Sequence, residues 1–312
     1  MATAIVILNY NTASDTIGCI QSIEAYNTAP IKYIVVDNGS SDKEGIRLID
    51  EFFNNSQKSY LKLYDTDSHP QSLPYFCFLV SSRNDGYAKG NNKGLDLAYS
   101  DNSIQNILIL NSDVLFCEDI IPTLVHIQDS IDKCGLTTPL VLSRRGTIDH
   151  CCARKAPTNW QIIIPFLFFH RNWFKYISKA DEKQKILRNH PDLVKESLFP
   201  IDIPSGACMM IKKDVLQSLD SFDSRTFLYY EENILEKKTR KAGLVNYCIP
   251  TVKCIHLGAN STMQLSSIFL QKCSFNSADH YLRNYGQLTL IQSAIWAFVR
   301  ALWNFKFLLK SK

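Results

Sequence analysis

"ILILNSDVLF", residues 107–116, is a short apolar run interrupted by the polar triplet Asn111-Ser112-Asp113. A run of this length predicts a buried strand, because it is too short for an ordinary helix. The strand would then end at a carboxylate that follows an amide, with no glycine or proline to turn the chain. Two interpretations are open. Asp113 caps the next element, or it holds a charged group at the open edge of a sheet.

The first 140 residues alternate between strand and helix patterns, which predicts an α/β fold with a mostly parallel sheet and helices on both faces. Strands are predicted at 4–8, 32–36, 76–80 and 107–110, and helices at 14–26 and after the polar loop that begins at residue 83. Such sheets bind ligands at the carboxyl ends of their strands. Asn9, Asp37, Asn84 and Asp113 all fall there.

Residues 141–200 break this alternation, because an aromatic stretch is followed by a highly charged one. We expect an insertion that folds over the sheet. Regularity returns with predicted strands at 207–211 and 246–256, helices at 213–219 and 231–241, and an amphipathic helix at the end of the chain. The predicted organisation is one α/β domain over 1–262, divided near 140 and 200, and a helical segment over 263–312.

The composition, with 46% hydrophobic and 21% charged residues, is typical of a globular protein. No apolar run approaches the 18 residues that indicate a membrane-spanning helix. The ten cysteines include no CxxC pair, which favours reduced thiols in a cytosolic protein over a zinc site. Residues 281–312 contain five basic and no acidic side chains. The positive charge is therefore local, which argues against a nucleic-acid partner.

The turn after the first predicted strand, "LNYNTAS", contains no glycine. This excludes the glycine-rich dinucleotide fingerprint there, and the Walker phosphate-binding pattern is also absent. A bound diphosphate would need another counter-charge. A divalent cation held by Asp113 would supply it, since Mg²⁺ or Mn²⁺ needs only one or two carboxylates when phosphate oxygens complete the shell.

Seven short motifs occur in an order that resembles glycosyltransferase family 2, closest to the bacterial rhamnosyl- and galactosyl-type enzymes of surface polysaccharide synthesis. They are "VILNYN", "VVDNGSSD", "NDGYAKGNNKG", "LILNSD", "PSGACMMIKKDVL", "FLYYEEN" and "CIHLGANS", within residues 4–262. The resemblance implies a GT-A fold, a nucleotide-diphospho-sugar donor, Mg²⁺ or Mn²⁺, and inversion at the anomeric carbon. It also implies a saccharide or lipid-linked saccharide acceptor.

The resemblance also assigns roles to single residues. Asp37 stands at the position that contacts the nucleobase, and Asp113 at the last, metal-binding position of the D-x-D motif, with Asn111 in place of its first Asp. His256 stands where a histidine often lies near the diphosphate and the metal. The remaining donor-binding positions are Asn9, Asn84, Gly86 and Asn92.

The segment "YYEEN" departs from the usual pattern of Glu-Asp with a further acidic residue two positions on. Here Glu232 stands at the place of the catalytic Asp, and Glu231 precedes it. The resemblance implies that Glu232 is the catalytic base and that Glu231 positions it or the acceptor.

Other interpretations of these residues remain open. Asp37 can be a turn residue, His256 an ordinary core or surface histidine, and the glutamate pair a complement to a helix dipole. An inactive partner protein that keeps the fold is one alternative function, given Asn111 and Glu232. A sugar-nucleotide pyrophosphorylase is another, although "LNYNTAS" is not the expected triphosphate loop.

The C-terminal helix presents an apolar face and a polar face. The apolar face comprises Leu288, Ile291, Ile295, Phe298, Leu302 and Phe305, and the polar face Thr289, Gln292, Ser293, Arg300 and Asn304. Aromatic and basic residues without acidic partners suit a membrane interface, so we expect a peripheral protein on the inner face of the cell membrane. The alternative is a helix that packs on the core or on a second subunit in a homodimer.

Overall fold

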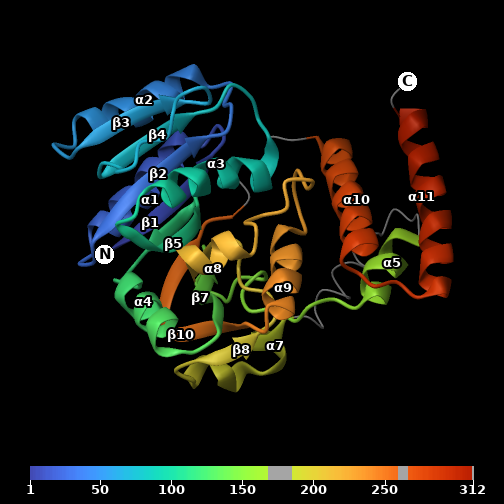
Figure 1. The fold of residues 1–312 in the computed structure, drawn as a ribbon. Helices are drawn as coiled ribbons and strands as arrows, with labels where there is room; N and C mark the ends of the chain where they lie inside the picture. The colour runs from blue at the N-terminus through green and yellow to red at the C-terminus, as the bar shows by residue number, and fades with distance from the viewer. Residues whose placement is uncertain (168–184, 259–265, 311–312) are drawn as a thin grey trace.

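The computed structural model describes residues 1–167, 185–258 and 266–310. Within them lies a ten-stranded sheet of order β3-β4-β2-β1-β5-β9-β7-β10-β6, with β8 paired to β10 (Figure 1). The strands are β1 Ala2–Asn9, β2 Ile31–Asp37, β3 Tyr60–Tyr64, β4 Phe76–Val80, β5 Ile104–Asn111, β6 Val114–Phe116, β7 Cys134–Ser143, β8 Phe199–Ile201, β9 Cys208–Lys212 and β10 Val245–His256.

The five strands from β3 to β5 run parallel. β9 runs antiparallel to both β5 and β7, while β10 runs parallel to β7 and pairs antiparallel with β6 and β8. The strand pairing places Asn9 beside Asp37, and Leu8 beside Asn111. The predicted α/β fold with a mostly parallel sheet is therefore confirmed. The near-continuous apolar sequences of β1, β2 and β5 are those of strands buried on both faces.

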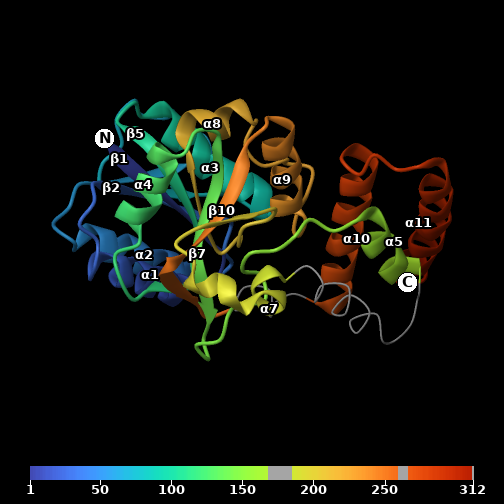
Figure 2. The same ribbon diagram turned by 90° about the horizontal axis from the view of Figure 1, so that it is seen from below.

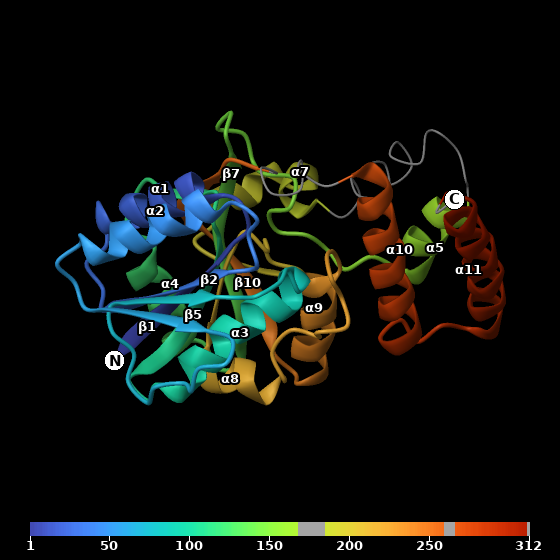
Figure 3. The ribbon, with the colours of Figure 1, turned by 90° about the horizontal axis from the view of Figure 1, so that it is seen from above.

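The described helices cover both faces of this sheet or lie outside it (Figure 2). They are α1 Ala13–Glu24, α2 Lys43–Asn54, α3 Gly86–Ser100, α4 Ile121–Ser130, α5 Asn159–Leu167, α7 Ile186–Asn189, α8 Lys213–Ser218, α9 Glu231–Lys241, α10 Ser267–Asn284 and α11 Leu290–Lys310, with a 3₁₀ helix at Pro191–Lys195. α1 and α2 lie on one face, and α3 and α8 on the other (Figure 3). Each face has its own apolar core, with Ile20 and Phe53 in one and Leu95 and Leu216 in the other.

A third core lies outside the sheet, in a group formed by α5, α10 and α11 that we call the three-helix unit (Figure 2). Phe166 of α5, Phe275 of α10, and Trp296 and Trp303 of α11 are each at most 3% exposed there. α11 belongs to this unit because it is apolar over most of its circumference. It can bury one side and leave the other in contact with solvent.

Three expectations about chain organisation change. β7 runs to Ser143 and β8 belongs to the sheet, so the stretch from 141 to 200 is not wholly an insertion; its residues 168–184 lie outside the described residues. The segment after residue 262 contains two described helices, since α10 precedes α11. Gln292, which we expected on the polar face of the last helix, is 8% exposed.

The side of α11 that packs inside the three-helix unit carries Trp296, Val299 and Trp303. Ile291, Phe298 and Phe305, from the predicted apolar face, are 69%, 58% and 62% exposed. The packing interpretation is therefore confirmed for one side of the helix, and the other side remains apolar and uncovered. Among the described helices, none is both long enough and apolar enough to cross a bilayer.

Candidate active site

The polar residues at the ends of β1 and β2 form a buried hydrogen-bond network. Asn9 Nδ2 donates to Asp37 Oδ1 at 2.7 Å, and the Ser40 hydroxyl donates to the same oxygen at 2.5 Å. The backbone N–H of Ser40 donates to Asp37 Oδ2 at 3.1 Å. Asp37 is fully buried, so its carboxylate organises the turn after β2. Asn9 and Asp37 are thus brought together as their positions at the strand ends predicted.

The loop before α3 joins this cluster through its amides. Asn38 Nδ2 donates to Asn84 Oδ1 at 3.0 Å, and the N–H of Gly86 donates to that oxygen at 2.9 Å. Gly86 has φ +82°, and a Cβ on it would lie 2.3 Å from the carbonyl oxygen of Phe227. Only glycine meets both conditions without strain. The loop therefore lies directly against the segment that leads into α9.

Asn92 lies apart from these strand ends. Its side chain donates to the carbonyl of Phe222 at 2.9 Å and accepts from the N–H of Phe222 at 3.1 Å. Its amide is therefore occupied in holding α3 to the loop before α9.

Asp113 lies in the turn between β5 and β6. A strand follows it, and the next helix begins only at Ile121, so the interpretation of Asp113 as a helix cap is wrong. β6 pairs with β10 in the register Val114↔His256. This pairing places His256 Nε2 3.4 Å from Asp113 Oδ1.

The other ring nitrogen of His256 faces a second carboxylate, because Nδ1 lies 3.2 Å from Asp149 Oδ2. Burial lowers the pKa of His256, but hydrogen bonds and charge interactions with Asp113 and Asp149 outweigh burial and raise the pKa to about 10. The side chains of all three residues are 6–14% exposed. Without a bound metal, a protonated imidazole would thus bridge two carboxylates.

These residues fit a divalent cation. Carboxylate oxygen and imidazole nitrogen are both ligands of Mn²⁺, and Mg²⁺ accepts one or two carboxylates beside phosphate oxygens. Asp113 and His256 would hold the ion. Asp149 would orient the imidazole ring, as carboxylates behind metal-binding histidines do.

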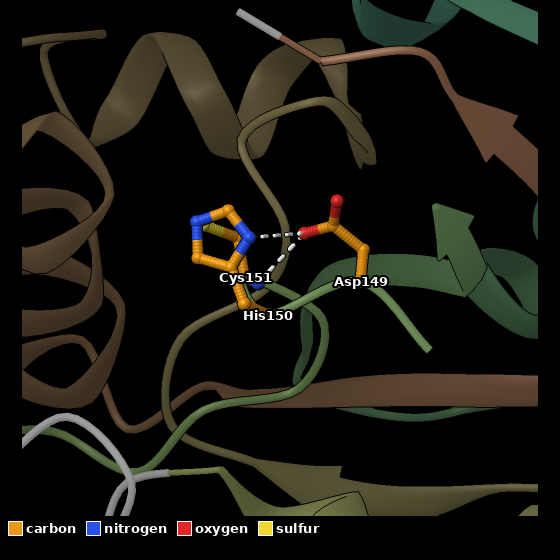
Figure 4. Close-up of side chains that lie close together, drawn as sticks. All are labelled: Asp149, His150 and Cys151. Atoms are coloured by element: carbon orange, nitrogen blue, oxygen red, sulfur yellow. Dashed lines mark hydrogen bonds and ion pairs between the residues drawn. The ribbon is translucent and has the colours of Figure 1, made fainter. Parts of the chain in front are cut away.

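Asp149 also begins a cluster with the next two residues (Figure 4). Its Oδ1 accepts from the N–H of Cys151 at 2.7 Å and lies 3.5 Å from His150 Nδ1. The potential ligand atoms of Asp149, His150 and Cys151 lie within 4.8 Å of one another. The His150 side chain is 67% exposed, so Asp149, shared with His256, is the member of this cluster that is tied to the strand-end site.

A cavity of about 560 Å³ lies between the sheet and the three-helix unit. Glu231 and Glu232, from the first turn of α9, line it together with Asn111 at the end of β5. Ile162 and Phe166 of α5 and Leu270 of α10 supply apolar lining. The cavity thus combines two carboxylates, an amide beside the turn that contains Asp113, and a hydrophobic wall.

The two glutamates differ in environment. Glu231 is 4% exposed. Burial, and then the charge of Glu232, raise the pKa of Glu231 to about 8, although Thr226 and backbone N–H groups lower it. The Glu232 side chain is 21% exposed, and Arg154 Nη2 lies 4.0 Å from its Oε2. Glu232 is therefore the more accessible carboxylate, and Glu231 holds a proton at neutral pH.

The backbone before these glutamates is strained. Tyr229 and Tyr230 have φ values of 75° and 68°, a region that non-glycine residues enter at a cost of roughly 1–3 kcal/mol each. α10 stabilises this conformation, because the Ser277 hydroxyl donates to the carbonyl of Leu228 at 2.9 Å. The ring of Tyr281 also lies 5.4 Å from that of Tyr230.

The sequence did not indicate three residues of this site, namely Asp149, Arg154 and Tyr87, of which Tyr87 and Arg154 line the cavity. Asp149 and Arg154 come from residues 141–200, which we predicted to be an insertion, and neither lies in a recognisable motif. Tyr87 was quoted within a glycine-rich motif, but nothing in the sequence distinguished it from a core aromatic residue.

The chain is similar to known glycosyltransferases in sequence and in fold. Residues 4–137 match the family described as Glycosyl transferase family 2. Two curated proteins, from the CDC 1551/Oshkosh and H37Rv strains of Mycobacterium tuberculosis, are 30% identical to the chain over 161 residues. Each is an N-acetylglucosaminyl-diphospho-decaprenol L-rhamnosyltransferase, and the match covers 50% of this chain and 48% of the relative. The chain thus spans about half the length of these curated relatives.

Among solved structures, a crystal structure of GalNAc-T7 with UDP, GalNAc and Mn²⁺ is similar, with a TM-score of 0.58 and 13% sequence identity. The similarity covers 84% of this chain and 45% of that one. At this identity the comparison shows the fold alone, and it confirms the expected GT-A architecture. The expected resemblance is confirmed over part of the chain, since residues 4–137 match glycosyl transferase family 2.

Proposed function

We propose that the protein is an inverting glycosyltransferase, which moves a sugar from a nucleotide-diphospho-sugar to a saccharide acceptor. The observation that carries this proposal is the cavity in which Glu231 and Glu232 face Asn111, two residues before Asp113. This cavity supports the proposal because its two carboxylates share it with Asn111, at the strand end that precedes Asp113. The relatives, named for rhamnosyl transfer, support the reaction class.

In this mechanism Glu232 accepts the proton of the acceptor hydroxyl as that oxygen attacks the anomeric carbon. The bond from that carbon to the diphosphate breaks on the opposite side, and the nucleoside diphosphate leaves. Asp113 and His256 would hold Mg²⁺ or Mn²⁺, which stabilises the charge of the leaving diphosphate when bound. Glu231, protonated and buried, would position Glu232 or the acceptor.

Donor binding is proposed for Asn9, Asp37, Asn84, Gly86, Asn92 and Asn111. Asn9, Asp37, Asn84 and Gly86 are supported by their place at the strand ends, and Asn111 by its position in the cavity wall. Asn92 would act indirectly, since its amide binds the backbone of Phe222.

The apolar wall of the cavity supports an acceptor carried on a lipid. Ile162, Phe166 and Leu270 contribute this wall, and the relatives are named for an acceptor on diphospho-decaprenol. We propose a role in cell-surface polysaccharide synthesis at the inner face of the membrane. The organisation would be a catalytic domain over 1–262 and a membrane-associating segment over 263–312.

The surface proposed to meet the membrane is the uncovered side of α11. Ile291, Phe298 and Phe305 are exposed there, and α11 contains no acidic residue. An anionic lipid surface complements an apolar helix face without negative charge. A homodimer that covers the same face is the alternative, and the membrane binding test below distinguishes the two.

The substitutions at Asn111 and Glu232 keep one other function under consideration, that of an inactive partner protein. Release of nucleoside diphosphate from a panel of nucleotide-sugars with Mn²⁺ separates the two. We expect the parent to release it and Glu232→Gln to be slower by roughly 100-fold or more, because the amide cannot accept the proton. Glu44→Gln, an acidic residue in the first turn of α2, is the matched control.

A parent protein that turns over no donor, with or without acceptor lipids, would favour the inactive partner. Normal turnover by Glu232→Gln with an inactive Glu231→Gln would assign the base to Glu231. Activity of both variants would place the base elsewhere.

A further inference from the structure

The turn between Ser205 and Cys208, just before β9, contacts two elements of the site. The N–H of Asn111 donates to the carbonyl of Ala207 at 2.9 Å, at the strand end that precedes Asp113. The Tyr87 hydroxyl, from the first turn of α3, donates to the carbonyl of Gly206 at 2.9 Å. The turn therefore connects the end of β5, which precedes the predicted metal ligand Asp113, to the first turn of α3.

The same turn supports Glu232. A Cβ built on Gly206 would lie 1.8 Å from Glu232 Oε1 and 2.8 Å from its Cδ. The carboxylate thus rests against the Cα of Gly206, in space that any other residue would fill. The requirement for glycine here is spatial, and it sets how far the Glu232 side chain reaches into the cavity.

Tyr87 is suited to fix that turn. Its backbone N–H donates to the carbonyl of Phe227 at 2.7 Å, four residues before Glu231. Burial, and then the charges of Glu232 and Glu231, raise the pKa of Tyr87 well above the ordinary value. Its hydroxyl therefore keeps its proton and remains a donor. One residue thus holds both the surface under Glu232 and the segment that leads into α9.

We propose that Tyr87 and Gly206 position the Glu232 carboxylate, Gly206 by leaving the space it occupies and Tyr87 by fixing the Gly206 carbonyl. Tyr87 is a positioning residue, since it acts on Glu232 through the turn. The significance for catalysis rests on the proposed function, whereas the arrangement itself can be tested in the resting protein.

The experiment compares Tyr87→Phe with Tyr99→Phe in the full-length protein. Tyr87→Phe keeps the ring and removes one hydrogen bond. Tyr99→Phe is the matched control, because Tyr99 lies on the same helix and its hydroxyl bonds to Ser221 Oγ at 2.5 Å, outside the cavity lining. The Glu232 carboxyl signal is followed by NMR with ¹³C-labelled glutamate and assigned by its loss in Glu232→Gln.

We expect the pH titration of the Glu232 signal to shift in Tyr87→Phe and to be unchanged in Tyr99→Phe. We also expect kcat to fall about 5- to 10-fold in Tyr87→Phe, which is the effect of one hydrogen bond. The donor KM should stay within about 2-fold of the parent, because the change removes no donor binding that is common to the ground and transition states. The acidic limb of the kcat–pH profile, along which the proposed base Glu232 becomes protonated, should move with the NMR titration.

An unchanged Glu232 titration in Tyr87→Phe overturns the positioning role, whatever happens to turnover. If the Glu232 titration shifts in Tyr87→Phe while the parent itself shows no turnover, the positioning role is supported and the proposed function is overturned. Gly206→Ala gives a second test in protein that retains its parental circular dichroism. It should shift the same signal further, and an unmoved signal contradicts the role of Gly206.

Discussion

His256 meets Asp113 because β6 turns back from β5 and pairs with β10. Their side chains are 143 positions apart in the chain, and the antiparallel register brings them within ion-pair distance. The sequence predicted both as metal ligands through a family resemblance. The structure adds Asp149, which touches the far side of the imidazole ring.

Asp113→Ala should abolish metal-dependent donor binding while the fold is retained, because it removes the carboxylate ligand. Isothermal titration calorimetry with donor and Mn²⁺ measures this directly. Asp132→Ala, an exposed residue just before the amino end of β7, is the control. Tight donor binding by Asp113→Ala in the presence of Mn²⁺ would show that the metal role is wrong.

Asp149→Ala should weaken Mn²⁺ binding by about 10-fold or more, because a metal-binding histidine without its carboxylate partner loses orientation and basicity. The free ion can be followed by electron paramagnetic resonance without any turnover assay. His150→Ala, which keeps Asp149, should bind Mn²⁺ like the parent. Weakened Mn²⁺ binding in His150→Ala as well would move the metal to the cluster of Asp149, His150 and Cys151.

Glu231 should make stability depend on pH. Its pKa is about 8 in the folded protein and close to 4.3 in an unfolded chain. Between these values the folded state holds a proton that the unfolded state has released, so stability falls as pH rises through this window. In Glu231→Gln the fall should be shallower, as measured by urea denaturation at pH 5, 6, 7 and 8. Equal slopes in the two proteins would contradict the burial argument.

At the scale of elements, α11 has one side packed in the three-helix unit and another side exposed. Trp303 lies 5.3 Å from the ring of Phe275, and its Nε1 donates to the carbonyl of Phe166 at 2.8 Å. Trp296 Nε1 donates to Asp279 at 2.8 Å. α11 is thus attached to α5 and α10 by packing and by indole hydrogen bonds, while its outer side makes no such contacts among the described residues.

Trp303→Ala should lower the free energy of unfolding by about 3–5 kcal/mol, as is typical when a large buried aromatic side chain is removed. Phe305→Ala, two positions on and 62% exposed, should change it by no more than about 0.5 kcal/mol. Urea denaturation of both variants measures the difference. Similar losses in the two would mean that Phe305 is covered in solution, as a homodimer requires.

At the scale of the whole molecule, the three-helix unit adjoins the cavity lined by Glu231 and Glu232 and also carries the exposed apolar side of α11. α10 contributes to both, because Leu270 lines the cavity and Ser277 holds the segment before Glu231. A lipid-linked acceptor bound at this surface would thus lie close to the cavity.

Membrane binding is tested with the full chain and a triple variant, Ile291→Ser, Phe298→Ser and Phe305→Ser. These changes remove the exposed apolar side and leave the buried side of α11 intact. The parent should co-sediment with anionic vesicles, less so as salt screens the charge, and the triple variant should remain in the supernatant. A parent that never co-sediments, but forms dimers in analytical ultracentrifugation that the triple variant lacks, would support the homodimer instead.

The sequence alone determined the α/β fold, the strands at 4–8 and 76–80 and the resemblance to glycosyl transferase family 2 over residues 4–137. Strand periodicity and turn chemistry act over a few residues, and motif order is a property of the chain itself. For the same reason Asn9 and Asp37 could be placed together, since parallel strands end at a common edge.

Only the tertiary structure decided how Tyr87 reaches Gly206, how Asp149 reaches His256, and which side of α11 is buried. The first two contacts join residues more than 100 positions apart, and no local pattern specifies them. The periodicity of α11 predicted an apolar face through Ile291, Phe298 and Phe305, yet these residues are exposed and the side with Trp296 and Trp303 is buried. The positions of α5 and α10 selected the buried side, because the indole rings of Trp296 and Trp303 find packing partners and hydrogen-bond acceptors there.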